Sequence, residues 1–273
     1  MLKEMLKNLR EKAPLIHNIT NYVTVNDCAN VLLACGASPI MSDDPEEVEE
    51  ICALCAGLNI NIGTLNRHSI PAMRLAGRKA NALGRPLVLD PVGAGASRLR
   101  TECARELLQE LRISLIRGNI SEVKSLALGS GSTRGVDADL ADQLREETLP
   151  QALRFAREFS RSSGAILAIT GPIDIVCDGE RAFCIRNGHP LMSRITGSGC
   201  QLSAMSAAFL AANPEQPLEA AVAAVCAMGL CGEKAFSRMG PLDGNASYRN
   251  YIIDAIYKLQ PEELEAGARW ELA

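Results

Sequence analysis

A glycine-rich turn that leads into a helical pattern is the segment of this chain best suited to chemistry. The residues Arg194-Ile-Thr-Gly-Ser-Gly-Cys200 come directly before a helical pattern over Gln201–Ala212. Gly197 and Gly199 allow the backbone to turn tightly and to approach a ligand. The first amides of the next helix have no partner inside it and carry its positive dipole end, which suits a phosphoryl group. An ordinary tight turn has the same spacing, so spacing alone leaves both interpretations open.

Cys200 lies in the first turn of that predicted helix. At such a position we expect the thiol to have a pKa below the free value of ~8.5. Three roles remain open for it from the sequence: a base, a nucleophile or a buried bystander. Its place beside the anion turn distinguishes it from the other cysteines.

Two carboxylates follow predicted strands and are candidates for metal or phosphate binding. Glu122, in Asn119-Ile-Ser-Glu122, opens a helix and could hold Mg²⁺ through water, since Mg²⁺ keeps several waters and takes few protein ligands. The same four residues could instead form a capping box. Asp90 precedes Pro91-Val-Gly-Ala-Gly95 and could contact metal or phosphate, or only cap a turn.

Short apolar runs that alternate with amphipathic runs must position these groups. Strands are predicted at Leu15–Ile19, Ser38–Met41, Leu58–Ile62, Pro86–Asp90, Ile113–Arg117 and Ala165–Thr170. Helices are predicted at Val23–Cys35, Pro45–Ala56, Thr101–Leu111, Gln201–Ala212, Leu218–Phe236 and Tyr248–Leu259, and a hairpin joins Asp174–Cys177 to Ala182–Arg186. This alternation predicts a mostly parallel, doubly wound sheet with helices on both faces. Ligands bind beyond the carboxyl ends of such strands, where Asn21, Met41, Asp90, Arg117-Gly-Asn119 and Thr170-Gly171 stand.

Composition excludes several other classes of protein. The 273 residues carry a net charge of −4 and only 4% aromatic residues, which argues against a nucleic-acid surface. There is no P-loop, no protein-kinase motif set and no metal-hydrolase histidine spacing. The N-terminus lacks the apolar core of a signal peptide, and no stretch is apolar enough to span a bilayer, with Ala220–Gly232 too short. We therefore expect a cytoplasmic protein without membrane or nucleic-acid partners.

The chain also has ten cysteines and one segment rich in glycine and serine. Cys28 and Cys35 share a helical face with core spacing, and Cys52-Ala-Leu-Cys55 is formally a CxxC motif. Without a second CxxC or a nearby histidine, a core role is favoured over zinc or redox chemistry. The stretch Gly129–Asp137 is expected to be a flexible surface loop.

Six segments in order along the chain resemble the hydroxyethylthiazole kinase family, within the ribokinase-like superfamily. They are His17-Asn-Ile-Thr-Asn-Tyr-Val23, Gly36-Ala-Ser-Pro-Ile-Met41, Leu89-Asp-Pro-Val-Gly-Ala-Gly95, Arg117-Gly-Asn-Ile-Ser-Glu122, Thr170-Gly171 and Thr196-Gly-Ser-Gly-Cys200. The resemblance extends over nearly the whole chain. It implies one ribokinase-like domain over residues 1–273, with a mostly parallel sheet flanked by helices on both faces and no separate lid.

The resemblance also implies an activity and roles for particular residues. The expected reaction is ATP-dependent, Mg²⁺-requiring phosphorylation of the primary alcohol of 4-methyl-5-(2-hydroxyethyl)thiazole, in thiamine synthesis or salvage. The alternatives are a kinase for another heteroaromatic alcohol of pyrimidine or pyridoxal type, and a non-catalytic sensor of nucleotide or precursor. Family positions place Met41, Asn21 and Gly197 on the substrate, Arg117, Thr170 and Asn119 on ATP, and Glu122 and Asp90 on the metal and phosphate side. A homotrimer with sites at subunit interfaces is implied as well.

The residue at position 200 departs from the wider superfamily. Ribokinase-like sugar kinases have an aspartate there as the base, whereas this chain has Cys200. Phosphoryl transfer has a loose transition state, so positioning and charge stabilisation carry most of the rate acceleration. We therefore expect Cys200 to orient the hydroxyl and assist deprotonation weakly, while the turn's backbone amides, Ser198 and Gly199 included, contribute more.

Overall fold

In the described part of the chain, nine strands form one sheet in the order β2-β1-β3-β4-β5-β6-β7-β8-β9. The computed structural model describes residues 1–128 and 144–273, so the loop expected at Gly129–Asp137 lies outside the described residues. The strands from β1 to β6 pair in parallel, and β7, β8 and β9 add antiparallel pairs at one edge. The predicted mostly parallel, doubly wound sheet is confirmed. A short final strand, which the sequence did not indicate, extends the antiparallel edge.

The strands have the following bounds: β1 Leu15–Ile19, β2 Ser38–Met41, β3 Gly57–Asn61, β4 Leu87–Asp90, β5 Leu115–Asn119, β6 Ile166–Thr170, β7 Asp174–Cys177, β8 Ala182–Ile185 and β9 Trp270–Leu272. The helices are α1 Leu2–Lys12, α2 Val25–Cys35, α3 Val48–Leu54, α4 Ser69–Ala82, α5 Arg98–Glu110, α6 Ile120–Ala127, α7 Leu149–Ser163, α8 Ser198–Ala212, α9 Pro217–Arg238, α10 Asn245–Lys258 and α11 Pro261–Gly267. A 3₁₀ turn over Pro190–Arg194 leads toward α8.

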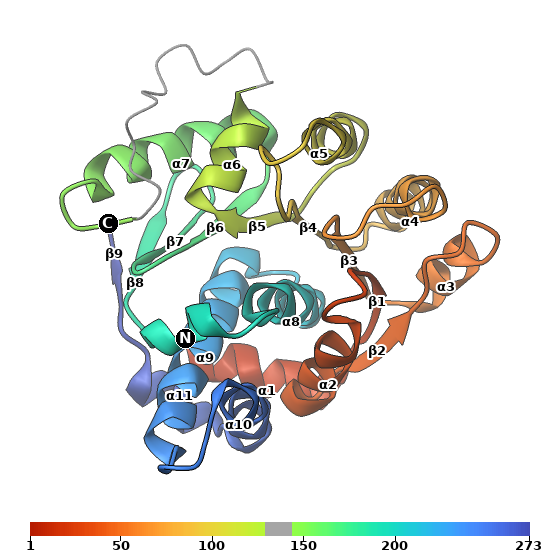
Figure 1. The fold of residues 1–273 in the computed structure, drawn as a ribbon. Helices are drawn as coiled ribbons and strands as arrows, with labels where there is room; N and C mark the ends of the chain where they lie inside the picture. The colour runs from red at the N-terminus through yellow and green to blue at the C-terminus, as the bar shows by residue number, and fades with distance from the viewer. Residues whose placement is uncertain (129–143) are drawn as a thin grey trace.

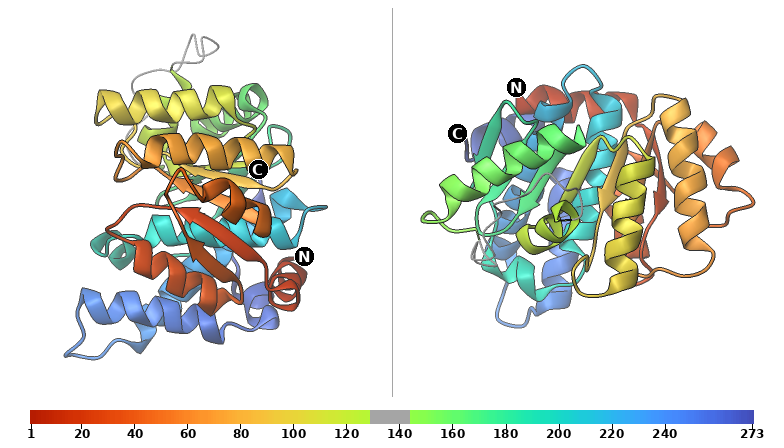
Figure 2. Two further views of the ribbon diagram at one scale, coloured as in Figure 1. Left: turned by 90° about the vertical axis from the view of Figure 1, so that its right-hand side faces the viewer. Right: turned by 90° about the horizontal axis from the view of Figure 1, so that it is seen from above.

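Helices cover both faces of the sheet. Figure 1 shows α3 to α7 on one face and α1, α2 and α8 to α11 on the other. Figure 2 shows the same layers from two further directions. Each face has its own cluster of buried apolar side chains, so the sheet separates two cores. The helices cover the faces of the sheet and not its ends. The loops that follow the carboxyl ends of the parallel strands can therefore form a site.

Local sequence signals explain several element boundaries. Helix α2 ends where Gly36 adopts a left-handed conformation with φ 102°, as the predicted C-cap requires. The predicted hairpin is confirmed, because Asp178 accepts hydrogen bonds from two backbone amides in the turn between β7 and β8. The helix expected over Pro45–Ala56 is shorter, however. It begins only at Val48, since residues 45–47 form turns.

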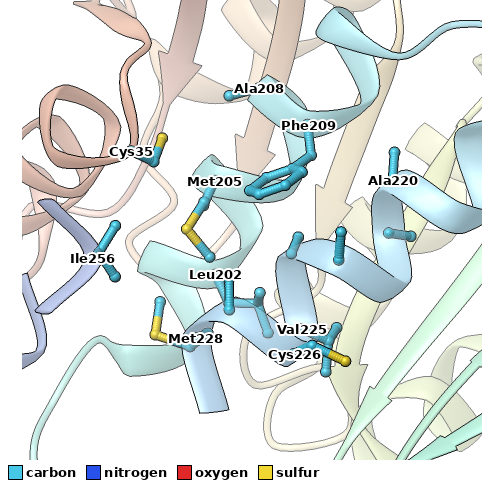
Figure 3. Close-up of a cluster of buried hydrophobic side chains, with 14 of the residues drawn as sticks. Cys35, Leu202, Met205, Ala208, Phe209, Ala220, Val225, Cys226, Met228 and Ile256 are labelled. Atoms are coloured by element: carbon cyan, nitrogen blue, oxygen red, sulfur yellow. The ribbon is translucent and has the colours of Figure 1, made fainter. Parts of the chain in front are cut away.

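Helices α8 and α9 form the centre of the thicker layer. Leu202, Met205 and Phe209 of α8 lie against α9, from which Val225 and Met228 approach (Figure 3). The alanine-rich composition of both helices allows this close packing. The prediction that no stretch is apolar enough to span a bilayer was wrong, because α9 is long and apolar enough to do so by length and composition alone. The helix is a core element, because 78% of its apolar window is buried inside the fold.

Candidate active site

The glycine-rich segment stands at the start of α8, as the sequence predicts, but the helix begins at Ser198 rather than at Gln201, so Gly199 belongs to its first turn. Gly197 has φ 87°, a conformation that favours glycine, and helix α8 begins at Ser198. No side chain caps this helix start within the described part of the chain. The first amides of α8 are therefore available to an anion.

The guanidinium of Arg117 lies directly over this turn. A Cβ atom added at Gly199 would overlap the guanidinium of Arg117, so the Arg117 side chain would have to move. Arg117 is held from the other side by Thr170, whose Oγ1 accepts a hydrogen bond of 2.7 Å from Nη2. Helix amides and a guanidinium thus meet at one place, which is a combination suited to phosphate.

A cavity of about 720 Å³ opens at this place. Its lining includes Arg117, Asn119, Thr170, Ser198 and Gly199, so the structure brings together five of the residues predicted for the phosphate and nucleotide side. The cavity continues away from the turn along the segment 186–190 and helix α9. A volume of this size accommodates a ligand well beyond a single phosphate group.

Of the residues predicted for the substrate side, Asn21 and Gly197 lie together with Cys200 at the turn. Asn21 Nδ2 donates to Cys200 Sγ at 3.2 Å, and Thr24 packs against Gly197, where an added Cβ would meet its Cγ2 at 2.5 Å. None of Asn21, Gly197 and Cys200 lines the described cavity. Met41 lies at the end of the edge strand β2 and packs against the same apolar cluster as Cys200.

The expectation of a low pKa for Cys200 was wrong. Burial raises the pKa of its thiol above the ordinary value, and the neighbouring Asp90 raises it further. Hydrogen bonds from Thr24 and Asn21 and the charge of Arg117 lower it by less. Only 9% of Cys200 is exposed, so loss of hydration outweighs the attraction of the helix terminus for a thiolate.

Asp90 is fully buried at the end of β4, beneath the turn. Its Oδ2 accepts hydrogen bonds from Asn61 Nδ2 at 2.7 Å and from Ser203 Oγ at 2.8 Å. Its Oδ1 has no hydrogen-bond partner in the described structure, although Arg117 Nη1 lies 3.8 Å away. Burial raises the pKa of Asp90 to about 6, against the lowering influence of Arg117.

Glu122 forms the capping box that the sequence allowed as an alternative. Asn119 accepts a hydrogen bond from the Glu122 amide, and the Glu122 carboxylate accepts one from the Asn119 amide, both at 2.9 Å. The other carboxylate oxygen accepts the amide of Gly93 at 2.9 Å, which ties α6 to the loop after β4. Among the described residues no group of three metal-binding side chains occurs. All ten cysteines, Cys52 and Cys55 included, are buried and free.

Asn61 and Ser203 are among the residues of this site that the sequence did not indicate. Asn61 links the two halves of the site, because it accepts from Asn21 at 3.0 Å and donates to Asp90. Asparagine at alternate positions of an otherwise apolar strand, at Asn59 and Asn61, was the available signal. Ser203, three residues after Cys200 on the same helix, gave no comparable signal.

The fold of this protein is shared with solved structures of known class. Its fold matches that of a ribokinase-like superfamily protein from Enterococcus faecalis, with a TM-score of 0.63, 13% identity and 94% of each chain covered. The predicted ribokinase-like fold is confirmed.

Closer relatives identify the family within that class. A profile of the hydroxyethylthiazole kinase family matches residues 6–262. The hydroxyethylthiazole kinase of Clostridium acetobutylicum is 59% identical over 271 residues, which cover 99% of each chain. The structure of a hydroxyethylthiazole kinase protein from Pyrococcus horikoshii OT3 matches with a TM-score of 0.89 and 35% identity, covering 100% of this chain and 98% of the other. The chain belongs to the hydroxyethylthiazole kinase family.

Proposed function

We propose that this protein transfers the γ-phosphoryl group of ATP to the primary alcohol of 4-methyl-5-(2-hydroxyethyl)thiazole. The products are the thiazole phosphate ester and ADP, and the role is supply of the thiazole half of thiamine. The observation that carries the proposal is the guanidinium of Arg117 above the uncapped turn at Gly199, at one end of a cavity. Membership of the family supports the choice of substrate.

The phosphate and nucleotide side consists of Arg117, Asn119, Thr170, Ser198 and Gly199. The amides of Ser198 and Gly199 would receive the equatorial oxygens of the transferring group, where negative charge gathers in the transition state. Arg117 would add its positive charge from above, kept in place by Thr170. These donors stand ready before the reaction, so no reorganisation is needed as charge develops.

The alcohol side consists of Asn21, Met41, Gly197 and Cys200. The alcohol oxygen attacks the γ-phosphorus, the bond to the β–γ bridging oxygen breaks, and the hydroxyl proton is released as the new ester forms. Because burial raises the pKa of Cys200, its side chain is a neutral thiol near pH 7 and a poor proton acceptor. Cys200 would therefore orient the hydroxyl, with Asn21 fixing the position of the sulfur.

Mg²⁺ would bind beside Asp90 and Glu122 through water and the ATP phosphates. The donor set fits this mode, because Mg²⁺ usually takes one or two carboxylates and keeps several waters. Asp90 has an unpartnered buried oxygen within the described structure, and its carboxylate is close enough to Glu122 for their charges to interact. The ion would neutralise charge on the transferring phosphoryl group.

We also propose a homotrimer in which neighbouring subunits complete the alcohol site. Tyr22 and Val23 follow Asn21 directly and are 60% and 65% exposed, an unusual arrangement for apolar side chains beside a buried site residue. Burial of these side chains by a second subunit would close the site to water. Light scattering on the purified protein tests this stoichiometry.

The test of the proposed activity is a comparison of alcohols with ATP, Mg²⁺ and purified protein. We expect the thiazole alcohol to give a product heavier by one phosphoryl group, with kcat/KM well above that of pyridoxal or a hydroxymethylpyrimidine. A preference for either of those alcohols would change the substrate assignment. Tight binding of ATP and the thiazole without turnover would instead indicate a sensor and refute the kinase.

A further inference from the structure

The cavity has a second end that phosphate groups do not require. Beyond Arg117 and Gly199, its lining comprises the segment Asn187–Pro190 together with Val225, Met228 and Gly229 of α9, and the two parts meet where Gly229 contacts Asn187. These α9 residues offer mainly apolar contact, which suits a planar base rather than a charged group. Val225 and Met228 are visible on α9 in Figure 3.

Asn187 and Gly188 form one wall of the cavity. Two charged residues that do not line the cavity, Glu233 and Arg269, hold this wall in place through hydrogen bonds. Glu233, one turn after Gly229 on α9, accepts the amide of Gly188 at 2.7 Å and Nδ2 of Asn187 at 3.3 Å. Arg269, the residue just before β9, donates to both oxygens of Glu233 at 3.0 and 2.7 Å. Such a two-pronged contact fixes direction as well as distance.

Arg269 also holds the wall through its backbone and through a second guanidinium contact. Its amide donates to Oδ1 of Asn187 at 2.6 Å, and Nη2 donates to the carbonyl of Arg186 at 2.6 Å. Asn187 is 7% exposed, and its Nδ2 also reaches the carbonyl of Gly267 at 3.0 Å. The last strand of the chain therefore ties this wall to the sheet edge, where β9 lies beside β8 in Figure 1.

Helix α9 packs directly against the backbone of Asn187. A Cβ atom at Gly229 would lie 2.8 Å from the backbone of Asn187, so α9 and the wall are in direct contact only because this residue is glycine. Gly188 has φ 132°, a conformation that other residues rarely adopt. The wall is thus set by Gly229 on one side and by the Glu233–Arg269 pair on the other.

We propose that the Glu233–Arg269 pair positions the wall that receives the nucleoside part of ATP. Both are positioning residues, since they act through Asn187 and Gly188 and do not line the cavity. The inference rests on the proposed function, which makes this cavity the ATP site. It predicts that loss of the pair weakens binding of the nucleoside and leaves binding of the phosphates intact.

The test compares Arg269→Ala with a matched control, Arg181→Ala. Arg181 pairs with Glu219, on the same helix α9, and neither residue lines the cavity. For Arg269→Ala we expect KM for ATP and Kd for ADP to rise about tenfold, the effect of losing charged hydrogen bonds. The Kd for inorganic tripolyphosphate, KM for the alcohol and kcat should stay within about twofold. Arg181→Ala should leave all five quantities near the wild-type values.

Three results for the binding constants would overturn the inference. They are equal weakening of ADP and tripolyphosphate, no weakening of either, and a wild-type protein that binds ADP no more tightly than tripolyphosphate. If Arg269→Ala does not fold, Glu233→Gln carries the same test, because it keeps an acceptor for the Gly188 amide and removes the charge. An inactive wild-type protein would refute the proposed function, and the two binding constants would still decide this inference.

Discussion

Asp174 is a buried carboxyl group whose ionisation should cost stability. It is the first residue of β7, lines the cavity and is 9% exposed, and its Oδ1 accepts the amide of Gly171 at 2.9 Å. Burial raises its pKa from 3.8 to about 7, although the Gly171 hydrogen bond and Arg117 act in the opposite direction. The perturbation we consider is Asp174→Asn, which keeps an acceptor oxygen and removes the charge.

The sign and the size of the effect follow from proton linkage. Between pH 4 and pH 7 the unfolded chain has released this proton while the folded chain still holds it, so the free energy of unfolding falls as pH rises. A difference of about 3 in pKa corresponds to a loss of about 4 kcal/mol by pH 8, of which about 2 kcal/mol is already present at pH 5. The asparagine variant does not undergo this loss.

Urea unfolding of both proteins at pH 5 and pH 8 measures the effect. We expect Asp174→Asn to be more stable than wild type at both values, with the advantage growing by about 2 kcal/mol toward pH 8. Asp44→Asn is the control, since Asp44 is exposed and likewise accepts one backbone amide, that of Glu46. A difference between wild type and Asp174→Asn that is the same at both pH values would refute the reasoning.

Three further substitutions separate the two sides of the site. Arg117→Ala should lower kcat/KM for ATP by about 10²–10³-fold in a steady-state assay, as loss of a transition-state donor does; a decrease of less than threefold would contradict its role. Asn21→Ala should raise KM for the thiazole alcohol about tenfold without changing KM for ATP, because it removes the contact with Cys200; an equal rise in both would contradict the division of the site. Cys200→Asp should remain active, because a carboxylate can serve the same alcohol proton, and a folded but inactive variant would count against the placement of the hydroxyl.

The parts of the site that the sequence predicted depend on local rules. Gly197 and the start of α8 follow from backbone conformation and helix termini, which a few neighbouring residues determine. Arg117 and Thr170 follow from the rule that ligands bind at the carboxyl ends of parallel strands. In the register of β5 and β6, Arg117 lies opposite Ala168 and Thr170 lies opposite Asn119, so the Arg117 side chain reaches Thr170 diagonally across the two strands.

Properties that depend on burial or on contacts between distant residues could not be predicted from the sequence. The pKa of Cys200 is raised because α8 is enclosed by the sheet and α9, which no local pattern reveals. Arg269 reaches Asn187 from 82 residues further along the chain, just before a strand only three residues long. The capping box at Glu122 was foreseen as an alternative, and local spacing did not show that the second oxygen binds Gly93.

The most direct test of the phosphate-binding turn is the rate of thiazole phosphorylation by Gly199→Val compared with Cys200→Ala. The account predicts that Gly199→Val loses at least about 10³-fold in kcat/KM, since its side chain would occupy the space of the Arg117 guanidinium. It predicts that Cys200→Ala keeps turnover within about 10²-fold of wild type. A Gly199→Val protein that works at the wild-type rate, or a Cys200→Ala protein with no turnover at all, would contradict it.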